Sequence, residues 1–146
     1  MRVKVEIDAS CTEPEIIIRT SELTDEINVL VQKLTITNQK VLTGFTEDGA
    51  ELIQMSDIIR IYAADKKVFI QTLANEYMVR LRLYELEERL DQSHFVRISN
   101  SEIVNLNAIK KIDLSFTGTI AMTLSNKKTA YVSRRYVSKI KQILGV

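Results

Sequence analysis

The side chains that most often perform catalysis are scarce in this sequence and show no catalytic spacing. There is one histidine, His94, and one cysteine, Cys11, so a His/Cys metal site and an intrachain disulfide are both excluded. The four glycines do not cluster into a phosphate-binding loop. Glu85, Glu87 and Glu88 lie close together, but on a predicted helix such a group usually forms a solvated face. We therefore predict that the protein is not an enzyme, binds no small-molecule substrate and requires neither metal nor cofactor.

Basic and amide side chains recur instead at three places that could form loop tips at one end of a β-rich body. These places are Asp65–Lys67, Arg97–Asn105 and Ser133–Tyr136. Lysine and arginine neutralise phosphates, whereas asparagine and arginine can also read base edges. Ser133 and the backbone N–H groups that follow it could hold a phosphate at a helix N-terminus. Each place alone is typical of a solvated loop, but together they favour nucleic-acid binding.

The charge distribution agrees with a polyanion-binding face. The whole chain has a net charge of +1, but residues 95–146 carry nine Lys or Arg and two acids, a net charge of +7. The preceding 94 residues therefore carry −6. Such a gradient favours a basic face for the partner and an acidic part that faces away, although small domains also acquire uneven charge by chance.

Length and composition indicate a folded cytoplasmic protein. The 146 residues suffice for one domain or two small lobes, and 45% apolar and 27% charged residues are typical of a globular chain. Apolar runs reach only three or four residues, which is too short for a transmembrane helix. The N-terminus lacks the apolar region of a signal peptide, and one cysteine fits a reducing compartment.

The periodicity of apolar residues predicts an α+β fold that is predominantly antiparallel β. A small acidic β-β-α lobe is expected over residues 1–40, with strands at 2–7 and 15–19 and an amphipathic helix from Glu22 to about Thr35, capped by Ser21. A β domain is expected over residues 41–146. Its predicted strands are 41–45, 51–55, 58–62, 68–72, 77–83, 95–98, 114–117, 120–124 and 129–132, with helices at 83–90 and after Ser133.

The stretch from Ser93 to Ile112 changes character along its length. Phe95–Ile98 reads as a strand, and Ser99, Asn100 and Ser101 are turn formers. The three-residue spacing of Ile103, Leu106, Ile109 and Ile112 predicts a helical turn or two packed on the core. Most of the remaining polar side chains are hydrogen-bond donors, as expected of a surface that binds an anion.

This stretch resembles the signature of the LytTR DNA-binding domain. The resemblance rests on His94–Ile112, with its strand, polar turn and following Val-Asn, on the upstream helix Leu83–Leu90 and on the downstream Val132–Tyr136. It covers about residues 41–144 in order and with natural spacing. One departure is that Ser99-Asn100 stands where the family usually has His-Arg, which removes a positive charge from a DNA-facing turn.

The resemblance implies an elongated β fold that inserts loops from one edge into successive major grooves and bends the DNA. Asn105 is expected to stabilise its turn without touching DNA. The chain is similar to a short, stand-alone subgroup without a receiver domain, often paired with a small membrane protein that restrains the regulator. The residues implied to contact DNA are Lys66, Lys67, Arg97, Asn100, Ser101, Arg134 and Arg135.

We therefore expect a bacterial transcription regulator that binds repeated promoter sites on double-stranded DNA. Dimerisation through the N-terminal lobe would increase affinity for paired sites, and the apolar stripe Leu23, Ile27, Leu30 and Leu34 could provide the contact. The same stripe could instead pack on the strands of its own chain. The alternative function is a protein-interaction or ligand-sensing module that keeps the fold without binding DNA.

Overall fold

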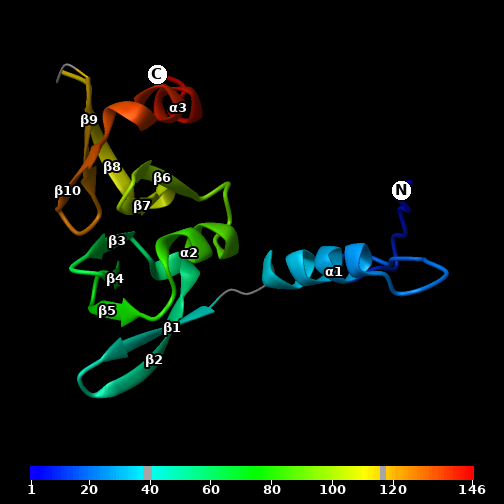
Figure 1. The fold of residues 1–146 in the computed structure, drawn as a ribbon. Helices are drawn as coiled ribbons and strands as arrows, with labels where there is room; N and C mark the ends of the chain where they lie inside the picture. The colour runs from blue at the N-terminus through cyan, green and yellow to red at the C-terminus, as the bar shows by residue number, and fades with distance from the viewer. Residues whose placement is uncertain (38–40, 116–117) are drawn as a thin grey trace.

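The computed structural model describes residues 1–37, 41–115 and 118–146. Segments with alternating apolar residues form antiparallel strands, and three amphipathic segments form helices (Figure 1). The predicted α+β class, predominantly antiparallel β, is confirmed. No helix in the described ranges is long and apolar enough to cross a membrane. In chain order the elements are α1 (Asp25–Thr37), β1 (Val41–Thr46), β2 (Gly49–Gln54), a 3-10 turn (Met55–Asp57), β3 (Arg60–Ala64), β4 (Lys67–Gln71), β5 (Glu76–Val79), α2 (Leu83–Arg89), β6 (Phe95–Ser99), β7 (Glu102–Asn105), a second 3-10 turn (Leu106–Ala108), β8 (Ile109–Asp113), β9 (Ile120–Leu124), β10 (Thr129–Val132) and α3 (Arg134–Leu144).

Two antiparallel sheets form the body of the molecule. The larger has seven strands in the order β2-β1-β5-β4-β3-β7-β6, and the smaller has three in the order β10-β9-β8. Short turns connect most neighbouring strands, which keeps their pairing local along the chain. The helix α3 follows β10 directly and packs against β6 and β10, so it joins the small sheet to the edge of the large one.

The buried side chains form two hydrophobic clusters that meet at β6 and β7. One cluster lies among β1–β5 and α2, and the other lies among the small sheet, α3 and the outer face of β6 and β7. Successive residues of β7 point to opposite faces, so Ile103 belongs to the first cluster and Val104 to the second. Phe95 and Val96 divide in the same way on β6. Both faces of this strand pair are therefore buried, which fixes its register.

The two strands predicted before α1 are wrong. Residues 1–24 contain no strand, and Val3, Val5 and Ile7 are 82–97% exposed. A period-two sequence forms a strand only when backbone partners are available, and within the described ranges this segment pairs with no strand. The helix of the lobe is present, but it begins at Asp25 and not at Glu22. Its cap is Thr24, whose hydroxyl accepts from the Ile27 N–H at 3.3 Å, in place of the predicted Ser21.

The segment after the β6–β7 turn also differs from the prediction. It forms β7 and β8 with a single 3-10 turn between them, not one or two turns of a packed helix. Strand pairing prevents the predicted helical turns, because β7 forms hydrogen bonds with β3 on one side and with β6 on the other. Only Leu106–Ala108 keeps a helical conformation. The predicted strand at 114–117 begins after the end of β8, and its residues Phe116 and Thr117 lie outside the described residues. The predicted domain boundary at residue 40 also lies outside the described residues.

Candidate nucleic-acid interface

The first predicted tip is the two-residue turn between β3 and β4. Ala64 pairs with Lys67, so Asp65 and Lys66 form the loop itself. Both have positive φ angles, 51° and 63°, as a type I′ turn requires. This turn matches the twist of the flanking strands and fixes the direction of the loop. Lys66 and Lys67 are both exposed at its end.

The second tip, the turn between β6 and β7, emerges beside the first. Tyr62 of β3 pairs with Glu102 of β7, and the strands are antiparallel, so the end of β3 lies next to the beginning of β7. The Ala63 N–H extends this ladder by donating to the Ser101 carbonyl at 2.8 Å. Because the two turns share a sheet edge and adjacent strands, their relative position is set by backbone hydrogen bonds.

Arg97 holds the second tip together from inside. Its guanidinium donates to the carbonyls of Ser99 at 2.7 Å and Asn100 at 2.5 Å, and to Glu87 Oε2 of α2 at 2.6 Å. Only 16% of its side chain is exposed. These contacts favour a supporting role for Arg97 over direct contact with a ligand. Ser101 lies in the same turn, and its N–H donates to Ser99 Oγ at 3.2 Å.

Asn100 lies at the point of the second tip and is linked to the third. It is exposed, and its Oδ1 accepts from the Tyr136 hydroxyl of α3 at 3.3 Å. Its amide N–H groups have no hydrogen-bond partner within the described ranges. An asparagine held by its carbonyl oxygen while its N–H groups face outward can donate to a base or a phosphate. Tyr136 was not predicted as a site residue. Its place in the Ser-Arg-Arg-Tyr element at residues 133–136 is the sequence feature that could have identified it.

The third tip is the start of α3, which begins after Ser133 as predicted. Ser133 has the extended backbone of an N-cap, but its hydroxyl makes no capping hydrogen bond. Its N–H instead donates to the Ile98 carbonyl of β6 at 2.9 Å, which ties the helix start to the second tip. Arg134 and Arg135 are exposed, and Arg134 lies against the β8–β9 connection, where a Cβ on Gly118 would be 3.1 Å from its Nε.

Two acids near these tips are paired with arginines, and Asp65 lies in the first tip itself. Glu87 is paired with Arg97 and Glu102 with Arg60, the latter at 3.0 Å between Nη1 and Oε1. Within the part of the chain that the structure describes, the exposed cations of the tips make no ion pair; these are Lys66, Lys67, Arg134 and Arg135. The site therefore presents four exposed cations and one acid, Asp65, around one outward-facing amide, a net positive arrangement suited to a phosphate backbone and its groove.

Asn105 confirms the structural role predicted for it. It is 4% exposed, and its Nδ2 donates to the Ile58 carbonyl at 2.9 Å. Its Oδ1 accepts from the Asn107 N–H at 3.0 Å, which caps the second 3-10 turn. The Nδ2 hydrogen bond joins β7 to the segment before β3, and the Oδ1 hydrogen bond holds the turn that follows β7.

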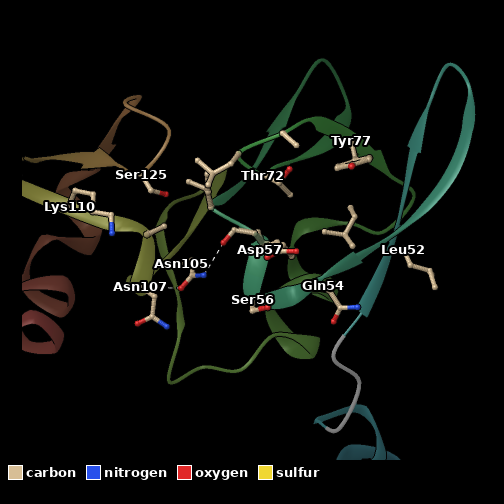
Figure 2. Close-up of a pocket in the computed structure, with 16 residues that line it drawn as sticks. Leu52, Gln54, Ser56, Asp57, Thr72, Tyr77, Asn105, Asn107, Lys110 and Ser125 are labelled. Atoms are coloured by element: carbon tan, nitrogen blue, oxygen red, sulfur yellow. Dashed lines mark hydrogen bonds between the residues drawn. The ribbon is translucent and has the colours of Figure 1, made fainter.

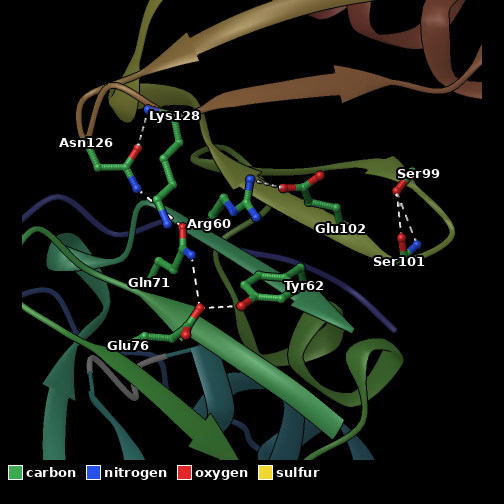
Figure 3. Close-up of polar contacts among 9 residues, drawn as sticks. All are labelled: Arg60, Tyr62, Gln71, Glu76, Ser99, Ser101, Glu102, Asn126 and Lys128. Atoms are coloured by element: carbon green, nitrogen blue, oxygen red, sulfur yellow. Dashed lines mark hydrogen bonds and ion pairs between the residues drawn. The ribbon is translucent and has the colours of Figure 1, made fainter. Parts of the chain in front are cut away.

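A polar network connects the two sheets behind the tips (Figure 3). Glu76 accepts from the Tyr62 hydroxyl and from Gln71 Nε2, and Gln71 Oε1 accepts from Asn126 Nδ2 in the β9–β10 turn at 3.3 Å. Burial, followed by the hydrogen bond to Glu76, raises the pKa of Tyr62 to about 12. The Tyr62 and Gln71 hydrogen bonds lower the pKa of Glu76. Arg60 stacks on the Tyr62 ring with its Cζ 4.8 Å from the centroid.

A cavity of about 390 Å³ lies elsewhere on the body (Figure 2). It is lined by β2, the first 3-10 turn, the β4–β5 turn and the segment from Asn105 to Lys110. Its labelled polar side chains include Asp57, Thr72 and Ser125. None of the seven residues predicted to contact DNA borders this cavity. It is therefore separate from the three tips.

Comparisons with known proteins identify the family of this chain. The family model of the LytTr DNA-binding domain matches residues 48–145. The chain belongs to the LytTR family. It is thus a member of a DNA-binding family, and the resemblance read from residues 83–136 is confirmed.

Relatives of this LytTR protein match along the whole chain. An uncharacterized HTH-type transcriptional regulator from Staphylococcus aureus strain bovine RF122 / ET3-1 is 35% identical over 147 aligned positions, covering 100% of this chain and 99% of that protein. Another so described, from strain MRSA252, is 34% identical with the same coverage. The solved LytTr DNA-binding domain of a putative methyl-accepting/DNA response regulator from Bacillus cereus superposes with a TM-score of 0.72 at 29% identity, covering 75% of this chain and all of that one.

The fold of this LytTR protein is not a helix-turn-helix, in contrast to the description those relatives carry. Strands β1–β5 separate α1 from α2, and β6–β10 separate α2 from α3, so no two helices in the described ranges follow each other directly. In a helix-turn-helix, the first helix crosses the DNA backbone and the second, the recognition helix, enters the major groove. The exposed cations and Asn100 here lie on turns between strands and at one helix start.

Proposed function

We propose that this LytTR protein is a transcription regulator that binds repeated promoter sites and inserts its three tips into successive major grooves. The observation that carries the proposal is that backbone and side-chain hydrogen bonds hold the three tips side by side, with their cations unpaired within the described ranges. Lys66, Lys67, Arg134 and Arg135 neutralise phosphates, and Asn100, with Ser101, reads base edges. Arg97 acts through the turn that it braces.

We further propose where the protein acts and which partners it has. The regulator acts in the cytoplasm, where promoter DNA is accessible, and residues 1–40 form a unit distinct from the DNA-binding domain at 41–146. Pairing of two chains through that unit would join two DNA-binding domains and raise affinity for repeated sites. A small membrane protein that restrains the regulator is a further partner, implied by the family resemblance.

Substitutions on two of the tips test the assignment, using DNA that the wild-type protein selects from a random pool. Arg135→Ala should weaken binding to selected and scrambled DNA alike and reduce the slope of log K against log salt by about 0.9, the value for one phosphate contact. Asn100→Ala should instead reduce the preference for selected DNA by about tenfold, because it removes base-edge hydrogen bonds without removing a charge.

The control is Lys141→Ala, which removes an exposed positive charge from the last turn of the same helix. It should change neither the affinity nor the salt slope. If Arg135→Ala and Asn100→Ala bind as well as wild type, the contact assignment is wrong. If the wild-type protein selects no DNA at low salt, the alternative of a ligand-sensing module gains support, and the 390 Å³ cavity is its candidate site.

A further inference from the structure

The first eight residues form a tract that pairs with no strand in the described ranges and has two distinct faces. Val3, Val5 and Ile7 alternate on one face and are 82–97% exposed. The other face carries Lys4 and Glu6, whose side chains lie on the same side, with Lys4 Nζ 3.0 Å from Glu6 Oε1. A turn ends the tract, because Asp8 Oδ1 accepts from the Ser10 N–H at 2.9 Å and the Cys11 N–H donates to the Asp8 carbonyl at 3.1 Å.

The tract lies far from the strands of its own body. It is at the end of α1 that points away from the two sheets (Figure 1). The 13 residues of α1 extend for about 20 Å, at 1.5 Å per residue. The edge strands of the large sheet, β2 and β6, belong to the body. An exposed apolar strand sequence without a partner is a surface for association with another chain.

The charges of the tract indicate that the associating chain is a second copy of this protein. The polar face reads Arg2, Lys4, Glu6, Asp8, with both positive charges first and both negative charges last. Two copies placed antiparallel about Val5 bring Lys4 opposite Glu6 and Arg2 opposite Asp8 in each direction. On the other face Val3 meets Ile7, and Val5 meets itself. Every cross-strand pair is therefore complementary, whereas a parallel pair in register would place like charges side by side.

We infer that this LytTR protein forms a symmetric dimer in which residues 2–8 of two copies pair as antiparallel strands centred on Val5. The interface is isologous, as a two-fold dimer requires. Two strands alone are marginal in water, so the association also needs apolar cover. Ile16 and Ile17, which are 73% and 71% exposed just after the tract, supply further apolar surface to be buried. The inference deepens the proposed function, because a dimer suits repeated sites, but the association is measurable without DNA.

Charge exchange in the full-length chain tests the pairing. In a dimer, Lys4→Glu turns both cross-strand ion pairs of the Lys4–Glu6 type into pairs of carboxylates, and Glu6→Lys turns both into pairs of ammonium groups. Each single variant should therefore dimerise about tenfold more weakly than wild type in analytical ultracentrifugation. An equimolar mixture of the two should regain wild-type affinity, because every pair is then opposite in charge. The Lys4–Glu6 contact within one chain cannot explain such a rescue, since neither variant retains it.

Cysteine cross-linking tests the register in a Cys11→Ser background. Val5→Cys should cross-link with itself under oxidation, and Val3→Cys should cross-link with Ile7→Cys when the two are mixed. Val3→Cys alone should not, because its two copies would be about 13 Å apart. A monomeric wild type over the micromolar range, or a dimer that both charge variants leave unchanged, overturns the inference. Binding of single-site DNA by the weakened variants reports the proposed function separately.

Discussion

Two side chains that are only partly exposed, Arg97 and Tyr136, hold the second tip in place. Arg97 satisfies two carbonyls of the β6–β7 turn and ties that turn to α2 through Glu87. Tyr136 connects the same turn to α3 through Asn100. Charge-assisted hydrogen bonds such as those of Arg97 are about twice as strong as neutral ones. The turn is therefore held from two helices, and the direction of Asn100 depends on both.

Tyr136→Phe tests this link, because it removes one hydroxyl and keeps the ring. The free energy of unfolding should change by about 1 kcal/mol or less, since a single exposed hydrogen bond is lost. Affinity for selected DNA should fall about fivefold, because Asn100 loses the group that orients it. Fluorescence anisotropy with labelled DNA measures the loss. Tyr131→Phe, at an exposed tyrosine of β10, is the control and should bind as wild type.

At the level of the elements, the small sheet is joined to the large one by few polar contacts. Gln71 at the end of β4 is 5% exposed and links Glu76 of β5 to Asn126 of the β9–β10 turn. A second contact is backbone to backbone, from the Ser133 N–H after β10 to the Ile98 carbonyl of β6 at 2.9 Å. The Gln71 contacts lie at the opposite end of β3 and β4 from the Lys66 tip. They therefore anchor the strands whose other ends form the first tip.

Gln71→Met keeps the length of the side chain and removes both hydrogen bonds. The free energy of unfolding should fall by about 1–3 kcal/mol, because the change removes two hydrogen bonds that contribute about 0.5–1.5 kcal/mol each. Urea denaturation measures it. The matched control is Gln54→Met, at an exposed glutamine in β2, which should change stability little. Equal effects of the two substitutions would show that the Gln71 network does not stabilise the fold.

At the level of the whole molecule, stability resides in residues 41–146. Every member of the two buried clusters lies in this range, from Leu42 to Ile140. The helix α1 projects from the body and contributes none of them (Figure 1). A unit that holds its own core is expected to fold without the segment that precedes it.

Deletion of residues 1–40 should therefore leave a folded domain with an unchanged urea midpoint and lower helix content by circular dichroism. The comparison is deletion of residues 134–146, which removes the helical segment at the other terminus. This deletion takes away α3 with the fully buried Ile140, so it should destabilise the domain by several kcal/mol. A 41–146 fragment that is unfolded would show that the N-terminal segment contributes to the core.

The sequence was sufficient to predict the parts of the fold that depend on local pattern. The strands β1 and β2, the helix Leu83–Arg89 and the start of α3 after Ser133 follow from apolar spacing and from the turn and cap residues beside them. The state of residues 103–112 was assigned incorrectly because strands outside this segment decide it: β3 pairs with β7, and β9 pairs with β8. A three-residue spacing cannot reveal such pairing.

The residue types of the candidate site could be predicted from the sequence. Which of these side chains are exposed at the tips and which support the turns could not. Exposed cations and Asn100 could be identified from composition and resemblance, since exposure is the usual state of such side chains. The contacts of Arg97 could not, because Glu87 approaches it from α2 only after β6 has packed beside that helix. The hydroxyl of Tyr136 meets Asn100 across 36 positions of sequence, and nothing local indicates that distance.

The β3–β4 turn shows a conflict between stability and recognition. Lys66 adopts a left-handed conformation, with φ at 63°, that glycine adopts without steric cost and that costs other residues about 1 kcal/mol. Lys66→Gly should therefore raise the urea midpoint while it weakens DNA binding, whereas Lys66→Ala should weaken binding with little change in the midpoint, because alanine carries the same Cβ as lysine. Selection for thermal stability alone would favour glycine here, so the lysine is expected to be among the first residues lost when the protein no longer needs to bind.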